Sequence, residues 1–240
     1  TRVVIVRDIT TLNRLLTMRQ SFVANVSHEL RTPLTVVKGY LETMVDESAP
    51  EDLRLSLIQK LSAPVNRMES LVQDLLLLTQ LESNPVPPEM DEIKMRDLIQ
   101  TAFNEVQGLV GSKDNLEINQ TSDARIRGIN QELSSVCIIL ISNALRSSPG
   151  GANVIVSWTD TKDGKARFAV QDKGLGIAKE HLNRITERFY RVDMKDSRTR
   201  GGTGLGLAIV KHVLRRHNSE LKVESSVGEG SLFYCDFETI

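Results

Sequence analysis

Apolar residues three and four positions apart follow one another along the first third of the chain. One set is Phe22, Val26, Leu30, Leu34, Val37, Leu41 and Met44, and a second is Leu57, Leu61, Val65, Met68, Val72, Leu75 and Leu78. This spacing places each set on one face of a helix. The pattern therefore predicts a helix from Thr11 to about Val45, and a second one that begins at the capping-box sequence of residues 48–51 and ends near Ser83.

Two long amphipathic helices joined by a short turn form a hairpin, and a single hairpin cannot bury two apolar stripes. We therefore expect a homodimer in which two hairpins pair into an all-α four-helix bundle. Burial of the stripes against the rest of the same chain is the alternative. Pro33 and Pro64 fall inside these helices, and the missing amide hydrogen predicts a local bend at each.

The remaining two thirds of the chain alternate between helical and strand-like patterns. Helical spacing runs from Met95 to Val106, from Asn130 to Arg146 and from Leu207 to Leu214. Strand-like runs lie at about 116–119, 124–129, 153–158, 165–171, 221–225 and 231–237. The alternation predicts an α+β sandwich with helices on one face of a mixed sheet.

These patterns divide the chain into four segments. Residues 11–83 form the hairpin and residues 91–240 the α+β domain. Residues 84–90 contain three prolines without helical spacing and are expected to form a linker. Residues 1–10 contain a β-branched run, Val3 to Val6, which reads either as the last strand of a preceding sensory domain or as a disordered stub.

Composition narrows the function classes. The 240 residues include 30 basic and 31 acidic side chains, so the net charge of −1 gives no basis for binding nucleic acid by neutralising phosphates. Cys137 and Cys235 lie in separate apolar runs, which favours two buried reduced thiols over a disulfide. The longest apolar run, Val136 to Ile141, is too short to cross a bilayer, and the chain begins at Thr1. We expect a soluble piece of a longer protein.

His28 falls between the apolar positions of the first helix, so its imidazole is expected to face solvent. Imidazole titrates near neutrality, so an unprotonated ring nitrogen can act as a nucleophile at cellular pH. Glu29 is placed to orient the ring or to accept its proton, and Thr32 lies one turn further along the same face. A histidine and a proline placed by chance on a solvated helix are the alternative.

The residues His28, Glu29, Thr32, Pro33 and Leu34 resemble the phospho-acceptor box of the bacterial two-component sensor histidine kinases. Four further stretches resemble the N, G1, F and G2 boxes of that family, in its order and with its rough separations: Asn143, Asp172 to Ile177, Glu187 to Asp193, and Gly201 to Leu207. The resemblance covers residues 10 to 240. Around His28 and Arg191 it is most similar to the phosphate-regulon sensor kinases, and it implies an ATP-binding domain of the histidine kinase, gyrase and heat-shock chaperone type.

The residues in these boxes suit a nucleotide and a metal ion. The amide oxygen of Asn143 is a suitable ligand for Mg²⁺, although a lone helical asparagine is usually only solvated. A carboxylate at a strand end, as at Asp172, can accept a hydrogen bond from an exocyclic amine, and by resemblance it selects adenine. Glycines at 202, 204 and 206 precede a helix N-terminus that suits phosphate, without a Walker-type lysine. Arg191 is placed to steady the γ-phosphate, or else forms an exposed salt bridge. The candidate ATP-binding residues are Asn143, Arg146, Asp172, Gly174, Gly176, Ile177, Arg191, Gly202, Thr203, Gly204, Leu205 and Gly206.

The resemblance therefore predicts an ATP-dependent kinase that phosphorylates His28 and passes the phosphate to an aspartate of a response regulator. Thr32 would orient water in a second, phosphatase activity toward that regulator. The implied location is the cytoplasmic portion of a bacterial inner-membrane sensor, with the membrane reached only through a missing N-terminal part. Two alternatives are a signalling scaffold that turns over poorly and an ATPase clamp of the gyrase or mismatch-repair kind, against which the reactive-histidine helix argues.

One departure from the family pattern carries a prediction of its own. Ile139 stands where the family commonly has a second asparagine, and Ser147 stands where it commonly has an aromatic residue or histidine. Both positions share a helix face with Asn143. Isoleucine offers no oxygen to Mg²⁺, so we expect weakened but not abolished nucleotide binding; packing of Ile139 in the core is the alternative.

Overall fold

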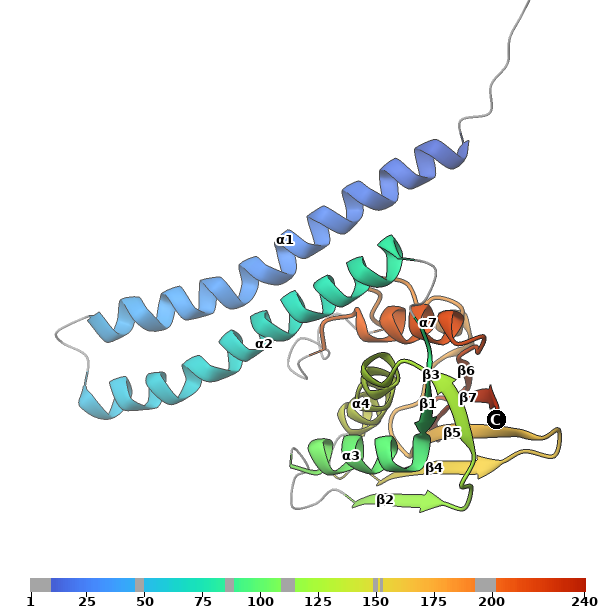
Figure 1. Cartoon of the computed structure of the whole chain (residues 1–240). Helices are drawn as coiled ribbons and strands as arrows, with labels where there is room; N and C mark the ends of the chain where they lie inside the picture. Colours follow the sequence, from blue (N-terminus) through green and yellow to red (C-terminus); the bar gives the residue numbers. More distant parts are fainter. Residues whose placement is uncertain are drawn as a thin grey trace, which may run out of the picture. The chain divides into compact units, whose positions relative to one another are not determined.

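The computed structural model describes residues 10–45, 50–84, 89–108, 115–148, 151, 153–192 and 202–240 (Figure 1). The chain divides into two compact units, and the boundary falls after Gln73, inside the second long helix. The strand expected at Val3 to Val6, the capping serine Ser48 and the linker prolines lie outside the described residues. Each unit is considered by itself below.

The two predicted helices are present, α1 in the first unit and α2 in the first unit up to Gln73. Helix α1 spans Thr10–Val45 and helix α2 spans Glu51–Ser83, and each continues through its internal proline. The bends expected at Pro33 and Pro64 stay predictions. Leu57 is buried, but several members of the apolar stripes are not, because Leu34, Leu41 and Val65 keep 58%, 47% and 46% of their surface exposed. The hairpin therefore leaves apolar surface uncovered within the single chain.

The second unit is built on a five-stranded mixed sheet with strand order β2-β4-β5-β7-β6. Strand β2 is parallel to β4, and all other neighbours are antiparallel. The strands span Asn115–Gln120 (β2), Asn153–Asp160 (β4), Lys165–Asp172 (β5), Lys222–Ser226 (β6) and Gly230–Glu238 (β7). A separate antiparallel pair joins β1 (Asp91–Lys94) to β3 (Arg125–Gly128).

Three helices cover one face of this sheet: α3 (Met95–Gln107), α4 (Asn130–Ser147) and α7 (Gly206–Arg216) (Figure 1). The strands alternate accordingly, since Val154, Val156 and Trp158 of β4 are fully buried while their neighbours are not. This arrangement confirms the predicted α+β sandwich. The four-residue β1 and the short helix α5 (Lys179–Leu182) were not predicted, because segments of this length carry too few positions to show a period.

Both cysteines lie in the core of the second unit. Cys137 of α4 and Cys235 of β7 are free and fully buried, as predicted. Burial raises the pKa of both thiols, which makes them poor nucleophiles. In the part of the chain that the structure describes, no helix is both long enough and apolar enough to cross a membrane.

Candidate functional site

His28 lies exposed on α1, as its place between the apolar positions predicts. The carboxylate of the adjacent Glu29 accepts a hydrogen bond from Arg67 Nη2 of α2 at 2.9 Å, and each of these two side chains is only 21% exposed. Thr32 Oγ1 donates to the carbonyl oxygen of His28 at 3.2 Å, which places its hydroxyl one turn from the histidine. The imidazole is thus open to solvent while the neighbouring carboxylate has a fixed partner.

Asp172 is the last residue of β5 and only 2% of its surface is exposed. Its Oδ1 accepts the backbone N–H of Gly174 at 2.8 Å, whereas its Oδ2 has no hydrogen-bond partner among the described residues. Burial raises the pKa of this carboxyl, and the backbone N–H groups of Gly174 and Ser231 lower it in part. A buried carboxylate oxygen without a donor is costly, so this atom suits a ligand that brings an N–H group.

The glycines after Asp172 allow two close backbone approaches. A Cβ on Gly174 would lie 2.3 Å from the carbonyl oxygen of Ser147, and one on Gly176 would lie 1.9 Å from that of Ser226. Gly176 also has φ +68°, a conformation that side chains disfavour. The backbone N–H of Ile177 donates to Ser225 Oγ at 2.8 Å. The Asp172 loop is therefore fixed between the end of α4 and strand β6.

The described part of the second glycine segment, Gly202 to Gly206, is fixed to the Glu187–Val192 stretch. The backbone N–H of Phe189 donates to the carbonyl oxygen of Gly204 at 2.7 Å, and a Cβ on Gly204 would lie 2.9 Å from the Cα of Phe189. Gly204 has φ +73°, and Phe189 itself has φ +62°. Strain of this kind in a non-glycine residue persists only where the surroundings enforce it. Leu205 is buried and precedes α7, whose N-terminus has no side-chain cap.

Helix α4 links the two glycine segments. Its Ile139 faces Gly206, because a Cβ there would lie 2.9 Å from Ile139 Cγ2, and its Ser147 contacts Gly174. Asn143 is half-buried one turn from each, and Ser147 Oγ donates to its carbonyl oxygen at 2.9 Å. The structure thus brings the α4 face, the Asp172 loop and the Gly202–Gly206 segment together. The weaker binding expected from Ile139 stays a prediction.

Two guanidinium groups border the glycine segment. Arg146 Nη1 and Arg191 Nη2 both lie 3.9 Å from the position that a Cβ on Gly202 would take. Burial lowers the pKa of Arg146, and the nearby Asp74 carboxylate raises it in part. Converging cations beside glycine backbone and an uncapped helix N-terminus favour a phosphate group.

In the described ranges, no three His, Cys, Asp or Glu side chains are grouped so that they hold a metal ion. A single amide such as Asn143 fits Mg²⁺ that takes its other oxygen ligands from phosphates and water.

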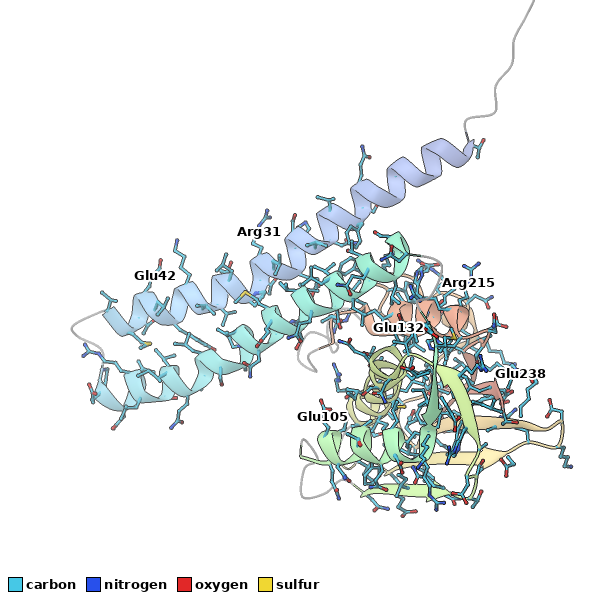
Figure 2. The ribbon with its side chains drawn as sticks, viewed as in Figure 1. Arg31, Glu42, Glu105, Glu132, Arg215 and Glu238 are labelled. Atoms are coloured by element: carbon cyan, nitrogen blue, oxygen red, sulfur yellow. The ribbon has the colours of Figure 1, made fainter. Side chains whose placement is uncertain are left out.

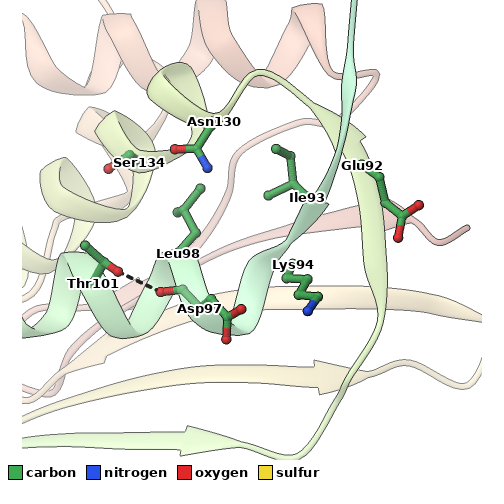
Figure 3. A pocket seen from close by; sticks show the side chains of 8 residues that line it. All are labelled: Glu92, Ile93, Lys94, Asp97, Leu98, Thr101, Asn130 and Ser134. Atoms are coloured by element: carbon green, nitrogen blue, oxygen red, sulfur yellow. Dashed lines mark hydrogen bonds between the residues drawn. The ribbon is translucent and has the colours of Figure 1, made fainter.

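A cavity of about 250 Å³ lies elsewhere in the second unit (Figure 3). It is lined by the starts of α3 and α4, with Lys94, Asp97 and Thr101 near Asn130 and Ser134. Thr101 Oγ1 donates to the carbonyl oxygen of Asp97 at 2.9 Å. The candidate residues of α4, Asn143 and Arg146, lie near the other end of that helix, so this cavity is distinct from the site described above.

Comparison with known families gives two matches along the chain. The "His Kinase A (phospho-acceptor) domain" matches residues 18–84, and the "Histidine kinase-, DNA gyrase B-, and HSP90-like ATPase" family matches residues 128–239. The first range contains His28, and the second contains Asn143, Asp172 and both glycine segments. The chain belongs to the sensor histidine kinases.

Relatives of this histidine kinase align over nearly its whole length. The phosphate regulon sensor protein PhoR of Pseudomonas aeruginosa is 42% identical over 235 residues, which are 97% of this chain and 53% of that protein. The sensor-like histidine kinase SenX3 of Mycolicibacterium smegmatis is 36% identical over 219 residues, or 90% of this chain and 56% of that protein. The chain therefore spans about half the length of these curated relatives.

A solved structure supports the fold. The histidine kinase ThkA, determined in complex with the response regulator protein TrrA, superposes with a TM-score of 0.69 at 18% identity, covering 97% of this chain and 65% of the ThkA chain. At that identity the likeness concerns the fold. It confirms a helical hairpin followed by a mixed α/β domain.

Proposed function

We propose that this chain is an ATP-dependent protein histidine kinase that phosphorylates His28. ATP bound to the second unit is the phosphoryl donor. An unprotonated ring nitrogen of His28 attacks the γ-phosphorus, an N–P bond forms, the bond to the β,γ-bridging oxygen breaks, and ADP leaves. The phosphoryl group then passes to an aspartate of a response regulator.

The observation that carries this proposal is the buried Oδ2 of Asp172, which has no hydrogen-bond partner among the described residues. The exocyclic amine of adenine supplies the N–H that this oxygen lacks. Gly174 and Gly176 allow the close backbone packing that fixes the loop around Asp172. Guanine presents a carbonyl oxygen at the corresponding position and would leave two acceptors facing each other. The site therefore favours ATP over GTP.

The phosphates are expected at the Gly202–Gly206 segment, which packs against Ile139 on the same face of α4. Arg146 and Arg191 border Gly202. The N-terminus of α7 has no side-chain cap, so its first backbone N–H groups are suited to bind phosphate oxygens. These groups neutralise charge that develops in the transition state. Mg²⁺, with Asn143 as its protein ligand, supplies further charge neutralisation of the phosphate oxygens when it is bound.

Glu29 serves the acceptor in this proposal. Its carboxylate is adjacent to His28 in sequence, and Arg67 restricts its motion through the 2.9 Å bond. A carboxylate held at the position next to the acceptor would orient the ring and take up its proton.

The exposed apolar residues of the hairpin support a homodimer, and the placement of Thr32 supports a second activity. With its hydroxyl one turn from His28, Thr32 would orient water for hydrolysis of the regulator's phosphoaspartate. A Thr32→Ala chain is then expected to keep autophosphorylation and to lose most regulator dephosphorylation, and equal loss of both activities contradicts the assignment.

The test of the kinase is transfer of radioactive γ-phosphate from Mg²⁺-ATP into the chain. We expect an acid-labile, base-stable label that is absent from a His28→Gln chain and present in a His212→Gln control. The His28→Gln chain should still bind ATP, because acceptor and nucleotide residues belong to different units. A folded wild-type chain that binds ATP without taking up label would favour the scaffold alternative instead.

A further inference from the structure

The end of α2 is packed onto the nucleotide-binding unit and belongs to it. This segment, Asp74 to Asn84, buries Leu78 and Leu81 to 1% and 4% exposure. Its Glu82 accepts a hydrogen bond from Arg188 and lies 3.5 Å from His212 Nε2. Arg216 of α7 donates to the carbonyl oxygen of Asn84. We call residues 74–84 the α2 end segment.

One acidic side chain of this segment reaches the glycine residues of the candidate site. Thr203 Oγ1, between Gly202 and Gly204, donates to Asp74 Oδ2 at 2.7 Å. Arg146 lies close enough to interact with the Asp74 carboxylate electrostatically, and Asp74 is half-buried. Burial raises the pKa of Asp74, whereas the bond from Thr203 and the charge of Arg146 lower it.

A carboxylate and a phosphate require the same partners here. Both are anions that accept from hydroxyl and guanidinium groups, and the single hydroxyl hydrogen of Thr203 cannot serve two acceptors at once. Two anions beside one cation in a half-buried place also repel each other. Asp74 and a nucleotide phosphate at this loop therefore exclude each other to a measurable degree.

We propose that Asp74 is a built-in competitor of the nucleotide phosphates, so that the seated α2 end segment is an autoinhibitory contact. ATP binding then requires the Asp74–Thr203 hydrogen bond to break. Because the coupling is reciprocal, anything that withdraws the α2 end segment raises the affinity for ATP, and ATP weakens the seating of the segment. This proposal rests on the proposed binding of ATP at the Gly202–Gly206 segment.

The alternative is that Asp74 helps ATP by holding Thr203 in place, and the two ideas predict opposite signs. Asp74→Asn keeps the size of the side chain and an oxygen that accepts from Thr203, but removes the charge. Glu69→Gln on the same helix is the matched control, because it also removes one negative charge, from an exposed residue of the first unit. Affinities of wild type and both variants are measured by calorimetry for Mg²⁺ with a non-hydrolysable ATP analogue, and for adenosine.

We expect Asp74→Asn to bind the ATP analogue about three- to tenfold more tightly, with adenosine affinity and the Glu69→Gln control unchanged. Unchanged or weaker binding of the ATP analogue would overturn the proposal. An equal gain for adenosine would do so too, because it would show a general loosening of the domain. If wild type and variants bind neither ligand, the proposed function itself fails, and this outcome is distinct from the other two.

Discussion

His217 shows how one side chain joins the two helices that border the site. Its ring is fully buried: Nδ1 lies 2.7 Å from the carbonyl oxygen of Val213 in α7, and Nε2 lies 3.0 Å from the backbone N–H of Ile129, which precedes α4. Nδ1 must donate and Nε2 must accept, so the ring is neutral. A Cβ on Gly128 would lie 2.9 Å from the ring, so the glycine at this position makes room for the imidazole.

The charges around His217 do not reverse this preference for a neutral imidazole ring. Glu132 (Figure 2) faces it with Oε2 at 3.9 Å from Nδ1, but the same carboxylate is paired with Arg216 at 3.0 Å. Burial lowers the pKa of His217, and the charge of Arg216 lowers it further. The hydrogen bond to the Val213 carbonyl and the charge of Glu132 raise the pKa, but by less. Protonation would place a second hydrogen against the N–H of Ile129 and break that bond.

We therefore predict that acid destabilises the nucleotide-binding unit through His217. The folded chain has the lower histidine pKa, so the unfolded chain binds the proton more readily. The contribution to the free energy of unfolding is fully present above about pH 6.5, the unfolded value, and is lost as the pH falls toward the folded value. Urea unfolding at several pH values, followed by fluorescence of Trp158, measures it, because this single tryptophan is buried in β4.

The matched variant for this measurement is His217→Gln, which has no proton to gain. It is expected to be less stable near pH 7 but to lose less stability between pH 7 and 5 than wild type. Parallel pH profiles for the two chains would contradict the role of His217 and assign the acid sensitivity to other groups.

At the scale of elements, the sequence predicted those helices and strands whose apolar residues show a clear period. Strands β4, β5 and β7 show apolar alternation over eight or nine residues, and α4 and α7 show helical spacing, so their existence and approximate bounds were foreseeable. The box residues were placed in one site because the resemblance linked them. Contacts between distant positions were missed: Arg67 with Glu29, and Asp74 with Thr203, are 38 and 129 residues apart. Glu29 and Thr203 belong to motifs, but their partners Arg67 and Asp74 are not marked by a period or a motif, since a single charge on a helix usually faces solvent.

The Glu29–Arg67 pair joins α1 to α2 beside the acceptor, and it yields a prediction on rate. If Arg67 acts by restraining Glu29, the two residues function as a unit, and their effects are not additive. We expect Glu29→Gln and Arg67→Met each to slow phosphate incorporation about tenfold or more, and the double variant to be no slower than the slower single variant. Single-turnover incorporation at saturating ATP measures the effect.

ATP affinity provides the control for this cycle. It should be the same in all four chains, because Glu29 and Arg67 belong to the first unit. An Arg67→Lys chain should recover part of the rate, since lysine keeps the charge. Fully multiplicative losses in the double variant would show that the two residues act independently.

At the scale of the molecule, the uncovered surface of the hairpin concerns assembly. Leu34, Leu41 and Val65 belong to the predicted apolar stripes, yet about half of each is exposed in the single chain. Burying one leucine side chain contributes about 1.5 to 3 kcal/mol, and twofold symmetry counts each residue twice. A second copy of the hairpin, which presents the same stripes, is the partner that we expect to cover them.

If the hairpins form a dimer through their apolar stripes, one charged residue introduced into a stripe should separate the two chains. Leu41→Glu places two carboxylates per dimer in an apolar interface, at a cost of several kcal/mol. The dissociation constant of the dimer should therefore rise by about two orders of magnitude or more. Sedimentation equilibrium should then give the 26.8 kDa mass of one chain for Leu41→Glu at concentrations where wild type has twice that mass. Val227→Glu is the control, because Val227 is 69% exposed in the second unit, outside the hairpin, and this variant should remain dimeric. Circular dichroism checks that the helices persist; a helical Leu41→Glu chain that stays dimeric would exclude this stripe from the interface.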